Sequence, residues 1–72
     1  MSMYSERNKY TYVEVDYSEH VITKAKLNGF GVNLSDDESV INLVLPQMVE
    51  KEEATKIVQN AGFNPTGKVD HR

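Results

Sequence analysis

Apolar and polar residues alternate in the segment YTYVEVD, residues 10–16. In an extended chain, Thr11, Val13 and Val15 would fall on one side, and two tyrosines and two acidic residues on the other. A period of two is typical of a strand with one buried face. The pattern therefore predicts a strand over these seven residues.

A second apolar segment, SVINLVLP, is rich in β-branched residues and ends at Pro46. Ile41, Leu43 and Leu45 would share one face, and proline cannot donate to a strand ladder. We predict a central strand over residues 40–45.

Helical spacing follows each of these strands. We expect the first helix to begin at Ser18, whose side-chain oxygen can cap an early backbone N–H. The second should begin between residues 46 and 50, with glutamates in its first turns, where the helix dipole favours anions. The residues expected to face the sheet are Val21, Ile22, Ala25 and Leu27 in the first helix, and Ala54, Ile57, Val58 and Ala61 in the second.

Two segments resemble each other, TKAKLNGFGVN at residues 23–33 and TKIVQNAGFNP at residues 55–65. Each reads as the last turns of a helix that stops at a glycine, Gly29 or Gly62. A left-handed residue costs little there, and the phenylalanine that follows, Phe30 or Phe63, would return the chain to the core.

The remaining strands complete a βαββαβ order over a single small α+β domain, residues 1–72. Phe30, Val32 and Leu34 would share one face of a third strand, SDDE is a polar turn, and a short last strand is expected around residues 68–70. This is the ferredoxin-like pattern, a four-stranded antiparallel sheet with two helices on one face. Residues 20–27 also suit a strand, and SDDE is also a capping box. An N-terminal β-hairpin followed by helices therefore stays open.

Composition narrows the class of protein. The chain has 72 residues, 39% hydrophobic and 26% charged, as in an ordinary globular domain with one core. It has no cysteine, so neither a disulfide nor a thiolate metal site is available, which is compatible with a reducing cytoplasm. No apolar segment suits an export signal or a membrane helix. We expect a cytoplasmic protein that does not enter a membrane.

Candidate chemistry lies in the loops that follow the two central strands. We expect these strands to be adjacent and parallel, which would gather Asp16, Ser18, His20 and Gln47 at one edge as a ligand site. The same residues also suit ordinary turn and capping roles. Neither a metal-ligand spacing nor a glycine-rich phosphate loop is present, so we expect no catalytic residue, no metal and no cofactor.

The sheet face away from the helices is the strongest binding candidate. It would expose two aromatic and two valine side chains, more apolar surface than a small monomer needs to show. This face indicates a partner-binding surface, either for a homodimer or for another protein. Its residues are Tyr10, Tyr12, Val40, Asn42 and Val44.

Single-stranded nucleic acid is an alternative ligand for this face, because tyrosines on an open sheet can stack bases. Cations would have to gather beside them, namely Arg7, Lys9, Lys68 and Arg72. The formal net charge of −3 disfavours this alternative, and the segment SVINLVLP lacks the glycine and aromatic pattern that RNA-recognition motifs carry in their third strand. The acidic runs DDE and EKEE suit a solvated turn and helix, or attraction of a basic partner.

The sequence thus predicts a small non-catalytic binding or regulatory protein that acts through protein–protein contact. By analogy, short acidic chains of this kind include inhibitors, adaptors and phage-encoded regulators.

Overall fold

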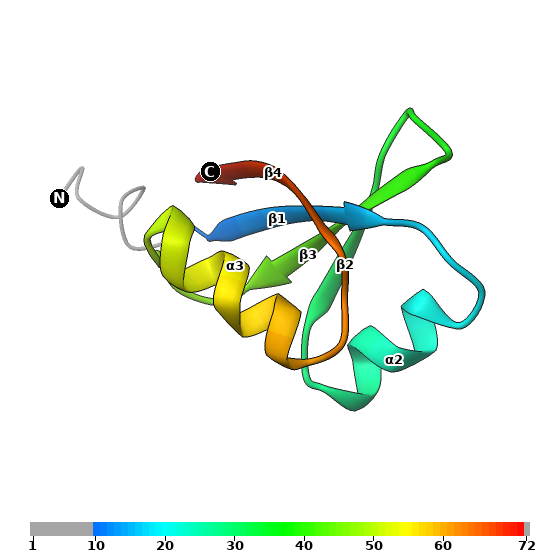
Figure 1. Ribbon diagram of the computed structural model, residues 1–72, viewed down its shortest axis with the longest axis horizontal. Coiled ribbons are helices and arrows are strands. Elements are labelled where there is room, and N and C mark those ends of the chain that lie inside the picture. Colours follow the sequence, from blue (N-terminus) through cyan, green and yellow to red (C-terminus); the bar gives the residue numbers. More distant parts are fainter. Residues whose placement is uncertain (1–9, 72) are drawn as a thin grey trace, which may run out of the picture.

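A computed structural model describes residues 10–71 of the chain (Figure 1). Its elements follow the order strand, helix, strand, strand, helix, strand, as the sequence predicts. They are β1 (Thr11–Asp16), α2 (Val21–Leu27), β2 (Gly31–Leu34), β3 (Val40–Leu45), α3 (Lys51–Asn60) and β4 (Pro65–His71). The alternative of a hairpin followed by helices is wrong, because residues 21–27 are helical and residues 40–45 form a strand.

The strands form one sheet in the order β2-β3-β1-β4, and every neighbouring pair is antiparallel. The expectation that the two central strands, β1 and β3, are parallel is therefore wrong. The physical reason lies in the connections. The crossover through α2 returns the chain as β2 in the direction of β1, and the short turn between β2 and β3 then reverses it. β3 consequently pairs with β1 in the opposite direction.

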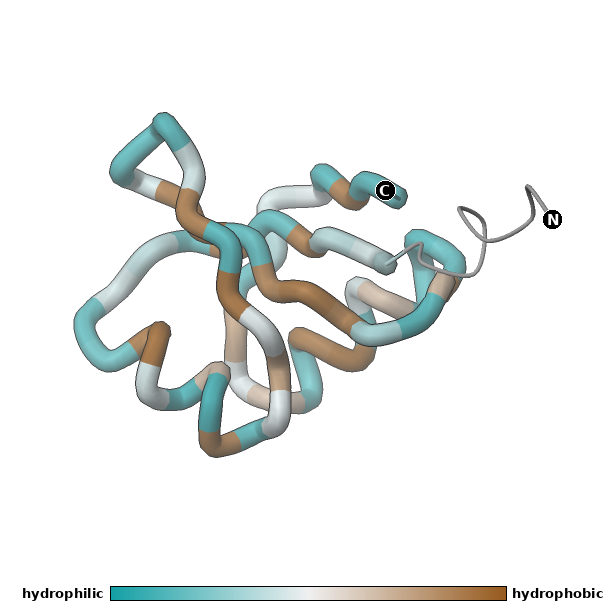
Figure 2. Tube along the Cα trace, turned by 180° about the vertical axis from the view of Figure 1, so that it is seen from behind, coloured by the Kyte–Doolittle hydropathy of each residue, from teal (hydrophilic) through white to brown (hydrophobic). Residues whose placement is uncertain are grey.

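The core lies between the sheet and the two helices. Every second residue of β1 and β3 is buried, as the alternation predicts, and β3 is apolar along most of its length (Figure 2). The buried residues of α2 and α3 join the same cluster, so both helices pack on one face of the sheet. This cluster consists of Val13, Val15, Val21, Ala25, Ile41, Leu43, Leu45, Val49, Ala54, Val58 and Phe63.

The two similar segments form the two helix ends. Backbone φ is +82° at Gly29 and +97° at Gly62. The phenylalanine after each glycine donates its N–H to the carbonyl five residues earlier, at 2.9 Å for Phe30 and 3.0 Å for Phe63. These bonds define a Schellman motif at each end. The rings of Phe30 and Phe63 meet with their centroids 5.9 Å apart, so the repeated segments converge in the core.

The start of the first helix differs from the prediction. α2 begins at Val21, and His20 before it has a positive φ of 72° with no side-chain cap. Ser18 contributes its main-chain carbonyl, which accepts the Val21 N–H at 3.1 Å. The expected Ser18 side-chain cap is wrong, because the chain turns once more before it becomes helical. Leu27, in the last turn, is 82% exposed rather than packed on the sheet.

The other helix and the last strand follow the prediction more closely. α3 starts at Lys51, directly after the predicted range of starts, and buries Ala54 and Val58 as expected. β4 is longer than predicted, because it begins at Pro65 and continues to His71. No helix within residues 10–71 is long and apolar enough to cross a membrane.

Candidate functional site

The open face of the sheet is formed by the residues that alternate with the buried ones. The register places Tyr12 between Val44 of β3 and Asp70 of β4. Glu14 lies opposite Asn42 of β3. Because both helices pack on the other side, the described helices leave this face uncovered.

The predicted partner-binding residues all keep some accessible surface. Tyr12, Val40, Asn42 and Val44 are half-buried, and Tyr10, directly before β1, is 38% exposed. A shallow hollow of about 200 Å³ lies among these strands. Its lining residues are Tyr12, Glu14, Ser35, Asn42, Lys68 and Asp70.

The charges on this face are mixed rather than basic. Lys68 lines the hollow together with two carboxylates, Glu14 and Asp70. The hydroxyl of Thr66 donates to the Glu14 carboxylate at 2.7 Å, which holds that side chain over β4. A phosphate approaching Lys68 would therefore also approach two anionic groups, which is unfavourable.

Three further cations were predicted beside the tyrosines, and they lie outside the described residues: Arg7, Lys9 and Arg72. The end of β4 does lie beside the start of β1, since His71 pairs with Thr11. The His71 ring, however, is at hydrogen-bond distance from the Val49 carbonyl, with Nε2 2.7 Å from it. It contacts the segment that leads into α3.

The four residues of the expected ligand loop are not brought together. In the β1–β3 register Asp16 pairs with Val40, whereas Thr11 pairs with Leu45. Gln47 follows Leu45 and so lies at the opposite end of β1 from Asp16. The expectation of one shared edge fails because it depended on parallel central strands.

The other residues of the expected ligand loop do not converge on one site. Ser18 is exposed, and the His20 side chain is 80% exposed, with its Nε2 3.9 Å from Glu19. Gln47 contributes its main-chain carbonyl, which accepts a bond from Thr11. Within residues 10–71 no group of three or more His, Cys, Asp or Glu side chains is arranged to hold a metal ion.

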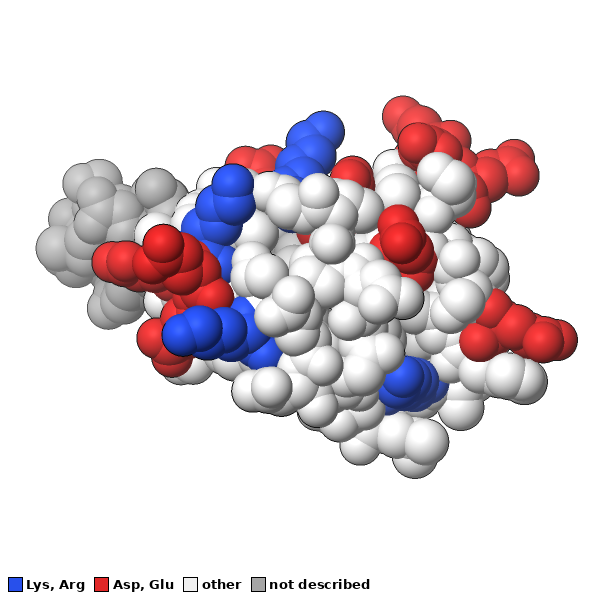
Figure 3. Space-filling view, in the orientation of Figure 1, with Lys and Arg blue, Asp and Glu red and all other residues white. Residues whose placement is uncertain are grey.

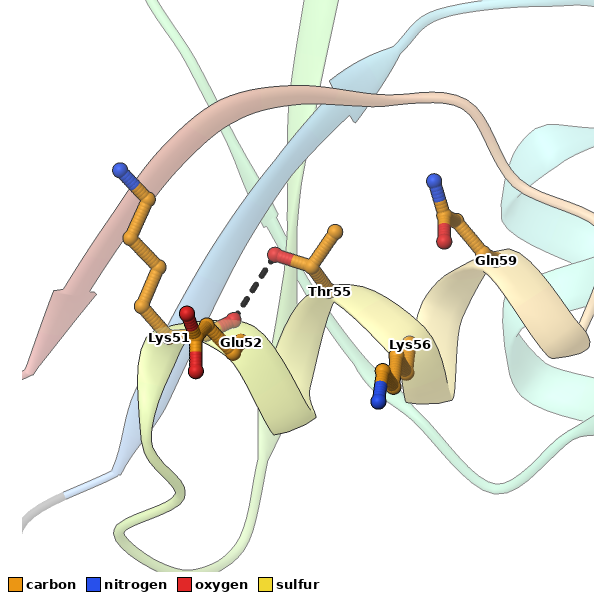
Figure 4. A pocket seen from close by; sticks show the side chains of 5 residues that line it. All are labelled: Lys51, Glu52, Thr55, Lys56 and Gln59. Carbon is orange, nitrogen blue, oxygen red and sulfur yellow. Dashed lines mark hydrogen bonds between the residues drawn. The ribbon is translucent and has the colours of Figure 1, made fainter.

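A hollow on the outer surface of α3 does not bring its polar side chains together around a ligand. Its lining side chains spread away from one another along the helix (Figure 4). The hydroxyl of Thr55 is already bonded to the Lys51 carbonyl at 2.8 Å. We interpret this surface as a solvated helix face. The lining residues are Lys51, Glu52, Thr55, Lys56 and Gln59.

Sequence reasoning missed another hollow, of about 330 Å³, between the loop after β1 and the β2–β3 hairpin. Leu34 was expected to share a strand face with Phe30 and Val32, which pack against the core, but it is 71% exposed at this place, because β2 extends past the short helix α2 (Figure 1). Tyr17 beside it is 48% exposed. An apolar residue at the end of a strand, followed by an acidic turn, was the available signal. The lining residues are Tyr17, Leu34, Ser35, Glu38 and Val40.

Comparison with known proteins adds no relative: no family model, curated protein or solved structure matches this chain.

The turn at the tip of this hairpin makes a testable prediction. Asp37 accepts hydrogen bonds from the Ser39 N–H at 2.9 Å and from the Ser39 hydroxyl at 2.7 Å. These bonds favour the ionised form and lower the pKa of Asp37 below its usual value of 3.8. Since the folded pKa is depressed, Asp37 stabilises the fold above its unfolded pKa. This stabilisation is lost as the pH falls through the folded pKa.

An NMR titration of the Asp37 carboxyl below pH 5 checks this. Ser39→Ala removes the hydroxyl and keeps the N–H, so we expect the Asp37 pKa to move part of the way back toward 3.8. Ser35→Ala is the matched control, because the Ser35 hydroxyl accepts from the Asp37 N–H and does not contact the carboxylate. An equal change in both variants would contradict this assignment.

Proposed function

We propose that this chain is a small non-catalytic binding domain of ferredoxin-like layout. In this proposal the open face of the sheet contacts another protein surface, first of all that of a second copy of the chain. The cytoplasmic location expected from the sequence is part of the same proposal. The observation that carries it is the packing of both helices on one side, which leaves the Tyr12 and Val44 face uncovered by the described elements.

The chemistry of this face suits a protein surface. Tyrosine supplies a large contact area at low entropic cost and is enriched at the centres of interfaces. Val44 pairs with Gly31 of β2, so no side chain of β2 stands directly beside it on this face. Glu14 and Lys68 then supply charges of both signs, which set the orientation of a partner.

Single-stranded nucleic acid is the second candidate from the sequence, and the charges around Tyr12 do not favour it. Its prediction differs clearly from that of a protein partner, since phosphate binding weakens steeply with added salt. Titration with single-stranded RNA and DNA at low salt would support it if Lys68→Ala also reduced the affinity.

The test of the proposal is the solution mass, measured by light scattering over a concentration series. We expect the 8.2 kDa chain to approach twice its mass as concentration rises, and Tyr12→Asp to remain monomeric, because the new carboxylate would be desolvated in the interface. Lys56→Gln on α3 is the matched control, since it changes the net charge by the same one unit on the helical side.

Circular dichroism of each variant shows whether the fold is kept. A wild-type chain that stays monomeric throughout would contradict self-association and would leave a different protein as the partner. A dimer that Tyr12→Asp does not weaken would contradict the use of this face.

A further inference from the structure

The hollow between the loop after β1 and the β2–β3 hairpin is a second surface, which adjoins the open face at Ser35 and Val40. It is held in shape by the backbone, because the Tyr17 N–H donates to the Ser39 carbonyl at 2.9 Å. Leu34 and Tyr17 present exposed apolar side chains there, 71% and 48% accessible. A volume of about 330 Å³ is enough for one large apolar side chain.

The two segments that form this hollow carry several acidic residues and no lysine or arginine. Acidic side chains gather at the end of the molecule formed by the β2–β3 turn and the segment before α2 (Figure 3). The sequence has no lysine or arginine within residues 10–23 or residues 27–50. We call the acidic residues of this end the acidic rim, and they are Asp16, Glu19, Asp36, Asp37 and Glu38.

The acidic rim is not neutralised from within the chain. None of its carboxylates has a lysine or arginine partner in the part of the chain that the structure describes, and the only ion pair there that involves the rim joins Glu19 to His20 at 3.9 Å. Asp37 is bonded to Ser39, which fixes its position and leaves its charge in place. Glu38 lines the hollow itself, so apolar surface and negative charge adjoin directly.

We propose that this hollow is a docking site for a basic segment of another protein. One apolar side chain of that segment would sit against Tyr17 and Leu34, and its lysine or arginine side chains would face the acidic rim. The charge complementarity decides the class of occupant, since an acidic partner or a nucleic acid would be repelled at the same place. Tyr12 does not line the hollow, so a variant at Tyr12 tests the open face alone, although Val40 belongs to both surfaces.

The test uses a synthetic peptide of sequence Lys-Arg-Trp-Arg-Lys with blocked ends, titrated into the whole ¹⁵N-labelled chain at low salt. We expect amide shifts at Tyr17 and at residues 34–40, and binding that weakens as salt is added. A peptide with serine in place of tryptophan should bind much more weakly. A tryptophan peptide with acidic flanks should not bind.

Two leucine variants separate a specific site from general charge attraction. Leu34→Ser removes the apolar contact without changing charge and should weaken binding of the tryptophan peptide by about tenfold. Leu27→Ser is the matched control, because Leu27 is 82% exposed and lies at the far end of α2, and its affinity should equal that of the wild type. Since both side chains are largely exposed, neither change should unfold the protein.

The Tyr12→Asp variant should bind the peptide as the wild type does, so failure of the open-face proposal and failure of this one are distinguishable. Undiminished binding by Leu34→Ser, equal binding of the serine peptide, or the absence of shifts around the hollow would each overturn the proposal.

Discussion

Replacing Phe63 with alanine should destabilise the fold by about 3–5 kcal/mol, the range for deleting a buried aromatic ring. Phe63 is only 6% exposed and its ring meets that of Phe30 at 5.9 Å. Lys24 Nζ lies 5.1 Å from the ring centroid and also donates to the Gly62 carbonyl at 2.7 Å. The alanine variant would lose these ring contacts at the point where the two helix ends converge. Small domains have about 5–15 kcal/mol of stability in total, so a large share would be lost.

Urea unfolding followed by circular dichroism measures this loss. Phe63→Leu should lie between the wild type and the alanine variant, because it keeps apolar volume but not the ring pair. Leu27→Ala is the surface control and should change stability by less than about 0.5 kcal/mol. A loss below about 1 kcal/mol for Phe63→Ala would contradict the central place given to this ring.

The two helix ends were predictable because their signals are local. A glycine at the end of a helical pattern supplies the positive φ, and the phenylalanine after it must be buried somewhere near. What the sequence does not carry is the meeting of Phe30 with Phe63. That contact depends on how the sheet brings together two phenylalanines that are 33 positions apart in the sequence.

The sequence-based predictions were wrong where the structure depends on how the chain turns between its helices and strands. Ser18 is a good capping residue, yet the turn at His20 intervenes and leaves its hydroxyl out of the helix start. Leu34 continues the apolar alternation of β2, but α2 is too short to cover it. The direction of β3 follows from the turn that precedes it, and no residue within β3 encodes that direction.

The candidate site was predictable in part, because alternation along a strand is a local signal. Alternation places Tyr12 and Val44 away from the core without any knowledge of topology. The neighbours on β4 required the register, which brings Asp70 beside Tyr12 and puts Lys68 among carboxylates. The basic surface that the nucleic-acid alternative requires is therefore absent from the described part of the open face.

Thr11 shows how one polar residue can be required inside an apolar face. Alternation puts it on the buried side, and the structure finds it 0% exposed. Its hydroxyl donates to the Gln47 carbonyl at 2.7 Å and accepts the Val49 N–H at 2.7 Å. The hydroxyl thus satisfies two main-chain groups of the segment that links β3 to α3.

Thr11→Val, which keeps the shape and removes the hydroxyl, should therefore cost about 1–3 kcal/mol, because the buried Val49 N–H loses its partner. The Gln47 carbonyl belongs to an exposed residue, so water can replace the hydroxyl there. Thr11→Ser keeps the hydroxyl and loses one methyl, so its cost should be near 1 kcal/mol. Urea unfolding gives both values, and hydrogen exchange of the Val49 amide should be faster in the valine variant alone. If valine proved more stable than serine at this position, packing rather than the two hydrogen bonds would hold the linking segment.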